Sequence, residues 1–386
     1  MKFFAHIERL NWELGYCSAK EQYPDKFIPA IVPGAVQLDI AREANYPDFN
    51  YADNYRLFRW MEDIYYTYRA RFNLPVLKNN ERLWFISKGI DYQFEIFINH
   101  ELIHEQEGMY VPVELDLTSY LQEVNWIEVK VMPVPKRHSF PEDKTQASHV
   151  TKPPVSYGWD WHPRLIPLGV WDDTYLEIRS ESYVNEVNVG YNLSDDFSVA
   201  NIHVHAEAIV KNESDYCWEL KDADGNIVLV EKGRMQPILD IEIALNTPKL
   251  WWPHDHGVPY LYSSCFYMFG NGGGVVQSIE NKIGFRKVQL VMNEGAWDEP
   301  EAFPKTRSVP PIQIELNGRK IFAKGTNWVN PEIFPGIITR DRYKELLDMA
   351  VATNFNIVRT WGGAVVNKAS FFELCDEMGI MVWQEF

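Results

Sequence analysis

The feature that most constrains the fold of this sequence is a set of short runs in which apolar and polar residues alternate. The apolar members of these runs are Tyr92, Phe94, Ile96 and Ile98; Val111, Val113, Leu115 and Leu117; Ile127, Val129 and Val131; and Ile202, Val204, Ala206, Ala208 and Val210. A period of two places every second side chain of an extended strand on the same face. Asn, Gly and Pro interrupt the runs, as they do between strands of antiparallel sandwiches. The sequence therefore predicts a multidomain, mainly β protein whose sheets each bury one face.

The alternating runs fall into two groups, which predict two β-sandwiches. We expect a jelly-roll-like sandwich over residues 1–180, closed by a strand at 170–178. A second sandwich is expected over 181–291, with a hairpin turn at 222–225, where the sequence reads Asp-Ala-Asp-Gly. Its length of about 110 residues fits an immunoglobulin-like module.

The pattern changes within residues 292–386, where strands are expected to alternate with helices. The expected strands cover 321–328, 355–361 and 380–386. Thr339 is placed to N-cap the first helix, and Gly379 to end the second. Strand–helix–strand–helix–strand is the opening of a parallel α/β unit. We interpret it as an incomplete (β/α)8 TIM barrel with the first three strands only.

Charge and composition narrow the class of protein. The net charge of −17 would repel nucleic acid at long range. The sequence contains no run of 18 or more apolar residues, so it predicts no membrane span. The N-terminus lacks a signal-like apolar stretch, which predicts a cytoplasmic protein, or a periplasmic or secreted one whose signal was removed. No cofactor is expected.

The densest cluster of unusual residues runs from Tyr157 to Arg164, where Asp160 stands between Trp159 and Trp161. A carboxylate can accept hydrogen bonds from two adjacent sugar hydroxyls, while tryptophan supplies an apolar platform. The alternative is a loop corner in which Asp160 pairs with Arg164. Composition leaves both interpretations open.

Polar residues and tryptophans also gather at the ends of the expected strands of 292–386. They are Asn327 and Trp328, Trp361 followed by two glycines, and Glu385. In a (β/α)8 barrel, functional residues lie at these strand ends. Glycine permits close approach of a ligand to the backbone, and Trp361 could line a sugar subsite. A simple strand-to-helix turn would require the same glycines.

Two further motifs favour structural interpretations. His203 and His205 share one face of a strand and could hold a metal, but no third ligand is visible in the sequence. We therefore predict an exposed polar face there and no metal site. The segment 250–253, which reads Leu-Trp-Trp-Pro, is expected to pack within the second sandwich.

Several motifs, taken in order along the chain, resemble those of β-mannosidases of glycoside hydrolase family 2. They are Gly158-Trp-Asp-Trp-His-Pro-Arg164, Leu168-Gly-Val-Trp171, Leu250-Trp-Trp-Pro253, Ile283-Gly-Phe-Arg286, Phe322-Ala-Lys-Gly-Thr-Asn-Trp328, Arg359-Thr-Trp-Gly-Gly363 and Val382-Trp-Gln-Glu-Phe386. The resemblance implies a retaining exo-β-mannosidase that hydrolyses terminal non-reducing β-D-mannose from β-mannoside oligosaccharides. It also implies that Trp159, Asp160 and Trp361 contact this mannose, with Asn327 and Trp328 as further candidates.

The same resemblance implies that the chain lacks its catalytic pair. Retaining glycosidases use two carboxyl groups about 5–5.5 Å apart. The family's acid/base and nucleophile are expected beyond the last residue, and Glu385 matches only a supporting position. We therefore expect an inactive fragment with no catalytic residue of its own. The alternatives are another family 2 exo-glycosidase, of the β-galactosidase or β-glucuronidase type, or a non-catalytic carbohydrate-binding module.

Overall fold

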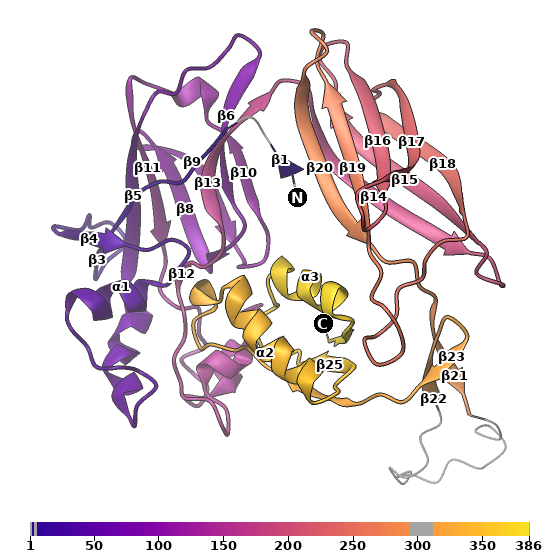
Figure 1. The fold of residues 1–386 in the computed structure, drawn as a ribbon. Coiled ribbons are helices and arrows are strands. Elements are labelled where there is room, and N and C mark those ends of the chain that lie inside the picture. The colour runs from indigo at the N-terminus through magenta and orange to yellow at the C-terminus, as the bar shows by residue number, and fades with distance from the viewer. Residues whose placement is uncertain (1, 4–5, 294–311, 386) are drawn as a thin grey trace.

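The computed structural model describes residues 2–3, 6–293 and 312–385. Two β-sandwiches lie side by side, and a smaller α/β segment lies beneath both (Figure 1). In this described part of the chain, no helix is long and apolar enough to cross a membrane.

The first sandwich is built from two antiparallel sheets. In the order of their pairing, the strands of one sheet are β4 (Phe27–Ala30), β3 (Trp12–Cys17), β5 (Tyr65–Asn73), β11 (Val124–Val131), β8 (Gln93–Ile98) and β9 (Glu101–Glu107). Those of the facing sheet are β10 (Val113–Asp116), β6 (Glu81–Ser87), β13 (Thr174–Ser180) and β2 (His6–Glu8), and a small ladder joins β12 (Gly169–Val170) to β7 (Ile90–Asp91).

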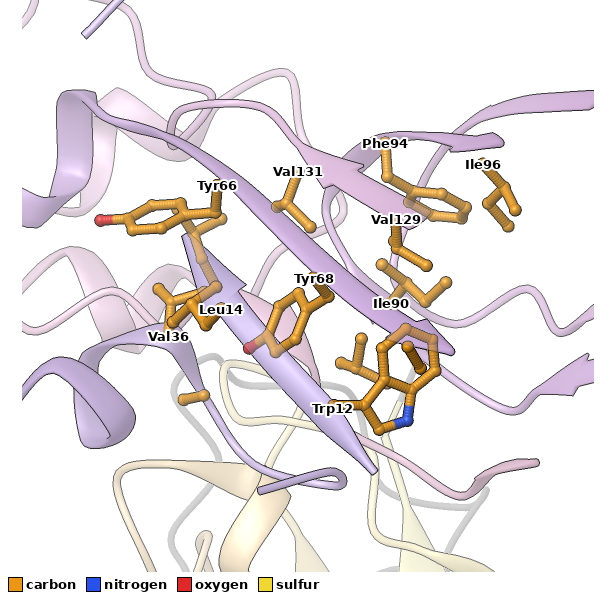
Figure 2. Close-up of a cluster of buried hydrophobic side chains, with 14 of the residues drawn as sticks. Trp12, Leu14, Val36, Tyr66, Tyr68, Ile90, Phe94, Ile96, Val129 and Val131 are labelled. Carbon is orange, nitrogen blue, oxygen red and sulfur yellow. The ribbon is translucent and has the colours of Figure 1, made fainter. Parts of the chain in front are cut away.

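The core of this sandwich lies between its sheets and follows the predicted alternation. Phe94 and Ile96 of β8 point inward beside Val129 and Val131 of β11 (Figure 2). Both pairs are buried because alternate residues of a strand face the same side of the sheet. The run predicted from residue 111 begins later, because Val111 is 59% exposed and precedes β10.

Helices of the first sandwich lie in its connections, several of them near the α/β segment (Figure 1). They are α1 (Val36–Glu43) and the 3-10 helices η1 (Asn54–Asp63), η2 (Thr118–Tyr120), η3 (Lys144–Ala147) and η4 (Pro154–Tyr157). The last two occupy the stretch between β11 and β13, and η4 leads directly into the Trp-Asp-Trp motif.

The second sandwich pairs two more antiparallel sheets. One has the order β1 (Lys2–Phe3), β20 (Val275–Ile283), β19 (Tyr262–Phe269), β16 (Asp215–Lys221) and β17 (Ile227–Arg234), and the other β14 (Tyr183–Leu193), β15 (Val199–Ile209) and β18 (Ile238–Asn246). Ile202, Val204 and Ala206 are buried between the sheets, as the alternation predicts. The backbone N–H of Gly225 donates to the carbonyl of Asp222 at 3.0 Å, which confirms the expected turn.

The α/β segment contains an antiparallel and a parallel sheet. The antiparallel strands are β21 (Val288–Met292), β22 (Ile312–Leu316) and β23 (Arg319–Ile321); the parallel ones are β24 (Gly325–Trp328), β25 (Ile357–Thr360) and β26 (Met381–Gln384). Between them lie η5 (Pro335–Ile337), α2 (Arg340–Ala352) and α3 (Ala369–Met378). The hydroxyl of Thr339 accepts from the N–H of Arg342 at 3.2 Å, so the predicted N-cap of α2 is confirmed.

The strand predicted over 321–328 is wrong in its middle, where the chain leaves the sheet between β23 and β24. The side-chain amide of Asn356 accounts for this break. It accepts from the N–H of Lys324 at 2.9 Å and donates to the carbonyl of Phe322 at 3.0 Å, so these backbone groups need no strand partner. Of the strand predicted over 380–386, Phe386 lies outside the described residues.

Both sandwiches hold the α/β segment in place. Phe334, just before η5, belongs to the core of the first sandwich. From the second sandwich, the indole N–H of Trp251 donates to the carbonyl of Asp376 at 2.8 Å. The backbone N–H of His254 donates to the carbonyl of Gly379 at 3.0 Å. Leu250 packs on the core of the second sandwich as predicted, whereas Trp251 is buried at the junction with the α/β segment.

Candidate functional site

Asp160 lies at the tip of a tight two-residue hairpin. Trp159 and His162 pair at its base, with N–H···O distances of 3.0 Å and 3.2 Å in the two directions. Asp160 and Trp161 form the turn and are both exposed. Gly158 enters this hairpin with a φ of +115°, a conformation that favours glycine. The backbone thus presents the Asp160 carboxylate to solvent beside two indole rings.

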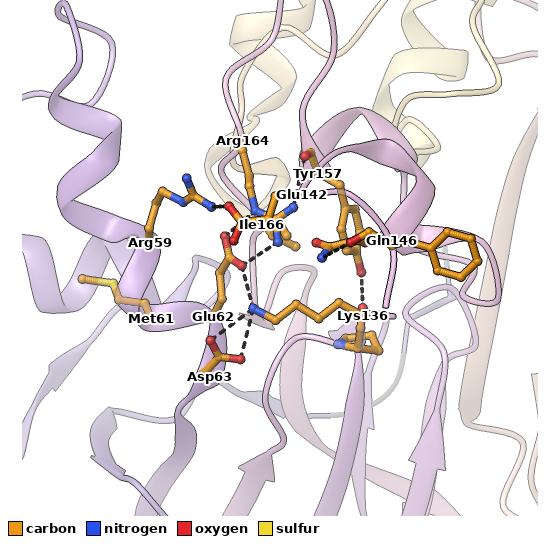
Figure 3. A network of polar contacts seen from close by, with 12 residues as sticks. Arg59, Met61, Glu62, Asp63, Lys136, Glu142, Gln146, Tyr157, Arg164 and Ile166 are labelled. Carbon is orange, nitrogen blue, oxygen red and sulfur yellow. Dashed lines mark hydrogen bonds and ion pairs between the residues drawn. The ribbon is translucent and has the colours of Figure 1, made fainter. Parts of the chain in front are cut away.

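A buried ionic network anchors the base of this hairpin (Figure 3). Arg164 donates from Nε and Nη2 to the two carboxylate oxygens of Glu62, at 3.0 Å and 2.8 Å. Lys136 reaches the same carboxylate at 2.9 Å. Burial alone would raise the pKa of Glu62, but the hydrogen bonds from Arg164 and Lys136 outweigh it and lower that pKa below 4.5.

This network bears on the loop-corner interpretation of Asp160. The guanidinium of Arg164 is engaged by Glu62, so the predicted alternative, a pair between Asp160 and Arg164, is absent from the described structure. Asp160 makes no hydrogen bond or ion pair with any residue that the structure describes. Its carboxylate is therefore available to an incoming hydroxyl group.

Trp361 brings the α/β segment into contact with the hairpin. Its ring centroid lies 5.0 Å from that of Trp159, at an interplanar angle of 73°, and 5.8 Å from that of Trp161. Edge-to-face packing at such distances stabilises an aromatic pair by about 0.5–1.5 kcal/mol beyond burial. The backbone N–H of Val155 in η4 also donates to the carbonyl of Gly363 at 3.3 Å. Residues about 200 positions apart in sequence therefore share one aromatic cluster.

The two glycines after Trp361 allow this arrangement. A Cβ atom at Gly363 would lie 2.4 Å from the indole ring of Trp361, so a larger residue would displace that ring. The N–H of Gly362 donates to Glu385 at 3.0 Å. This bond, followed by those from Arg359, lowers the pKa of Glu385. Both carboxylate oxygens of Glu385 thus accept hydrogen bonds from the end of β25 and the residues after it.

A surface pocket of about 550 Å³ lies around the hairpin. Its lining residues are Tyr55, Asp143, Lys144, Gly158, Trp159, Asp160, Trp161, His162, Pro163 and Arg164. The ammonium nitrogen of Lys144 lies 3.6 Å from the ring centroid of Trp159, a cation–π contact. Burial lowers the pKa of His162, which favours the neutral imidazole.

Asn327 and Trp328 are not brought to this pocket. Trp328 is 8% exposed and packs against Tyr343 and Phe371 under the helices. The side chain of Asn327 accepts from Arg359 at 2.9 Å. Consecutive residues of a strand face opposite sides, so β24 directs these two side chains apart. Trp361 is also absent from the lining of this pocket, and it joins the hairpin through its ring contacts with Trp159 and Trp161.

The pocket is suited to binding and lacks a catalytic carboxylate pair among its described lining residues. Of its two carboxylates, Asp143 caps η3 by accepting from Thr145 at 2.8 Å, which leaves Asp160. Sequence reasoning missed Glu62 and Lys144, because nothing local marks a glutamate in η1 or a lysine in η3 as a neighbour of this hairpin.

Comparison with known proteins finds two family models in tandem. The model described as glycosyl hydrolase 2 galactose-binding domain-like matches residues 12–172, and the model of glycosyl hydrolases family 2 matches 182–286. The β-mannosidase of Rattus norvegicus is 28% identical over 93% of this chain and 43% of the relative. The chain thus spans less than half the length of the curated relatives it matches.

Solved structures show the same arrangement. The β-D-mannosidase of Dictyoglomus thermophilum superposes with a TM-score of 0.83 at 27% identity, covering 100% of this chain and 47% of that one. The β-glucuronidase of Parabacteroides merdae gives a TM-score of 0.71 at 16% identity over 100% of this chain and 47% of its own. At that identity the second likeness extends to the fold alone.

Proposed function

The chain belongs to glycoside hydrolase family 2, and we propose that it is the N-terminal part of a retaining exo-β-mannosidase. In this proposal, residues 1–180 and 181–291 are a jelly-roll-like and an immunoglobulin-like domain. Residues 292–386 open a (β/α)8 barrel. The parallel order of β24, β25 and β26, with α2 and α3 between them, supports this barrel.

One observation carries the proposal for the site. The Trp159–Trp161 hairpin of the first sandwich meets Trp361 at the end of a parallel strand, with the carboxylate of Asp160 left unpaired by the described residues. Indole rings supply an apolar surface for the C–H face of a sugar, and a carboxylate accepts hydrogen bonds from adjacent hydroxyls. We assign the terminal β-mannosyl residue to this junction, with Trp159, Asp160 and Trp361 as its contacts.

The choice of mannose rests on the relatives. The curated proteins that match over more than nine tenths of this chain include mammalian and fungal β-mannosidases at 24–28% identity. The structure of a β-D-mannosidase also superposes with a TM-score of 0.83 at 27% identity. Both comparisons support mannose as the sugar.

The sugar preference can be tested by ligand binding to the native chain. Saturation-transfer NMR with methyl β-D-mannoside, methyl β-D-galactoside and methyl β-D-glucuronide should show the strongest transfer to the mannoside. Addition of the mannoside should then displace any signal from the other two. Stronger binding of the galactoside or the glucuronide would contradict the assignment as a β-mannosidase and favour a family 2 exo-glycosidase specific for that sugar.

The absence of catalysis is a separate part of the proposal. The described lining of the pocket offers only Asp160 as a free carboxylate, whereas retention requires two. The chain should therefore bind p-nitrophenyl β-D-mannoside without releasing nitrophenol above a blank. Release that scales with protein concentration would show that a catalytic pair is present.

A further inference from the structure

A second cluster of ionisable side chains lies on the outer face of the second sandwich, away from the sugar pocket. His203 and His205 alternate with the buried residues of β15, so both rings point outward from the β14–β15–β18 sheet. In the register of the sheet, His203 faces Glu242 and His205 faces Asp240 of β18. The third group that the sequence did not reveal is therefore Asp240, which follows in the chain only after 35 positions.

The geometry of this cluster converges on one carboxylate oxygen. Oδ1 of Asp240 lies 2.7 Å from Nδ1 of His205 and 3.3 Å from Nε2 of His203. One ligand atom from each of the three residues lies within 4.8 Å of the others. In a tetrahedral zinc site with bonds of about 2.0–2.1 Å, ligand atoms stand about 3.3–3.4 Å apart. Small side-chain rotations on an exposed face would bring all three into that range.

The remaining nitrogen of each ring faces a second carboxylate. Nδ1 of His203 lies 2.6 Å from Glu242, and Nε2 of His205 lies 3.5 Å from Glu207. A carboxylate in this position accepts the ring N–H, fixes the tautomer and makes the opposite nitrogen a better metal ligand. Each ring therefore directs one nitrogen toward Asp240 and has a carboxylate behind it.

The neighbouring strand leaves the cluster open. Gly190 of β14 stands opposite His203, and a Cβ atom there would meet nothing within 4 Å. Asn188 stands opposite His205 and carries no charge. The charged groups that face the two rings are thus Asp240 and Glu242 of β18 and Glu207 of β15, an excess of negative charge that attracts a cation.

We propose that His203, His205 and Asp240 bind a divalent transition metal ion of the zinc type, which links β15 to β18. Two imidazoles and one carboxylate favour zinc, nickel or copper over magnesium or calcium, which prefer oxygen ligands. A proton competes with the metal for the same nitrogens. Binding should therefore weaken as the pH falls.

Isothermal titration of the untagged native chain with zinc chloride tests this proposal. At pH 7.5 we expect one site with a dissociation constant below about 100 µM, and no binding of magnesium or calcium at the same concentrations. Asp240→Asn, which preserves shape, should weaken zinc binding at least about tenfold, and Glu242→Gln by about 10–100-fold. His100→Ala removes an exposed imidazole of the first sandwich and is the matched control, with unchanged affinity.

Thermal unfolding separates loss of the site from loss of the fold. In EDTA, native chain and Asp240→Asn should unfold at the same temperature, since Asp240 is exposed. Added zinc should raise the midpoint of the native chain only. Zinc affinity unchanged by His203→Ala/His205→Ala, or no zinc binding by the native chain, would overturn the proposal.

Discussion

Glu62 anchors the base of the hairpin that carries Asp160. It is 5% exposed, yet it accepts hydrogen bonds from both Arg164 and Lys136 (Figure 3). Removing one member of such a buried network leaves charges that have neither water nor a partner. The hairpin that carries Asp160 ends at His162, two residues before Arg164, and Arg164 lines the pocket, so a shift of the Glu62–Arg164 pair would reach the pocket.

We therefore expect Glu62→Gln to lower the free energy of unfolding by about 3–5 kcal/mol. Urea denaturation followed by tryptophan fluorescence would measure this loss. The matched control is Glu142→Gln, an exposed glutamate that pairs with Arg59 and whose loss should change stability little. Equal effects of the two substitutions would contradict the anchoring role of Glu62.

The same carboxylate predicts a pH dependence. The pKa of Glu62 is lowered in the folded chain from its ordinary value of 4.5. A group with a lowered folded pKa stabilises the fold above its unfolded pKa, and that contribution is lost as the pH falls through the folded value. The stability difference between native chain and Glu62→Gln should be constant from pH 7 to about 5.5 and shrink below about 4.5. Denaturation curves across this range would show a constant difference if the network were not formed.

At the scale of elements, the end of α3 is a precise contact between the α/β segment and the second sandwich. Gly379 has a φ of +72°, and its carbonyl accepts from the N–H of His254 at 3.0 Å. A Cβ atom on Gly379 would lie 2.6 Å from that nitrogen. The glycine is thus required by conformation and by close approach together.

Gly379→Ala should lower the thermal midpoint more than Gly225→Ala does. Gly225 has a comparable φ of +86°, but a Cβ atom there meets nothing within 4 Å. Gly225→Ala should therefore lower the free energy of unfolding by only about 1 kcal/mol, which is the cost of alanine in the left-handed conformation. Differential scanning calorimetry of both variants isolates the cost of the clash with His254. Equal midpoints would mean that this junction adapts freely.

The sequence predicted helices and strands correctly where interactions between neighbouring residues determine them. The alternating strands of both sandwiches and the N-cap at Thr339 need only neighbouring residues. The break between β23 and β24 could not be predicted, because Asn356 satisfies that backbone from more than 30 positions away. The burial of Trp328 likewise depends on helices that follow it in the chain.

At the scale of the molecule, the contact between Trp361 and the hairpin depends on how the α/β segment docks on the first sandwich. Phe334 lies fully buried in the core of that sandwich, with its ring centroid 5.0 Å from that of Phe49. Gly336 follows it, and a Cβ atom there would meet the carbonyl oxygen of Gly34 at 2.1 Å. This close contact fixes the surface from which Trp361 reaches the hairpin.

Phe334→Ala should loosen this docking and destabilise the chain by about 3–5 kcal/mol. Limited proteolysis should then cut the variant faster in the stretch between β24 and α2, which contains Phe334. Phe322→Ala, which removes a ring that is 80% exposed, is the matched control and should resist protease like the native chain. Identical cleavage rates for the two variants would show that Phe334 does not hold the segment.

The motifs alone predicted members of the proposed sugar site but not their arrangement. Trp159, Asp160 and Trp361 were proposed as sugar contacts from the family resemblance of their motifs, and that role stays a prediction. Their meeting could not be predicted from spacing, because it depends on how the α/β segment docks on the first sandwich. Asn327 and Trp328 followed from the strand-end rule, which does not say which side chain of a pair faces the ligand.

The most direct test of the account is calorimetric titration of the native chain with methyl β-D-mannoside, in parallel with Asp160→Asn and Asp195→Asn. Asp195 is a fully exposed carboxylate of the second sandwich and serves as the control. A hydrogen bond to a charged group contributes about 1.5–3 kcal/mol, so Asp160→Asn should bind at least about tenfold more weakly than the native chain. Asp195→Asn should bind as the native chain does. Equal affinity of Asp160→Asn and the native chain would contradict the assignment of the mannosyl residue to this junction.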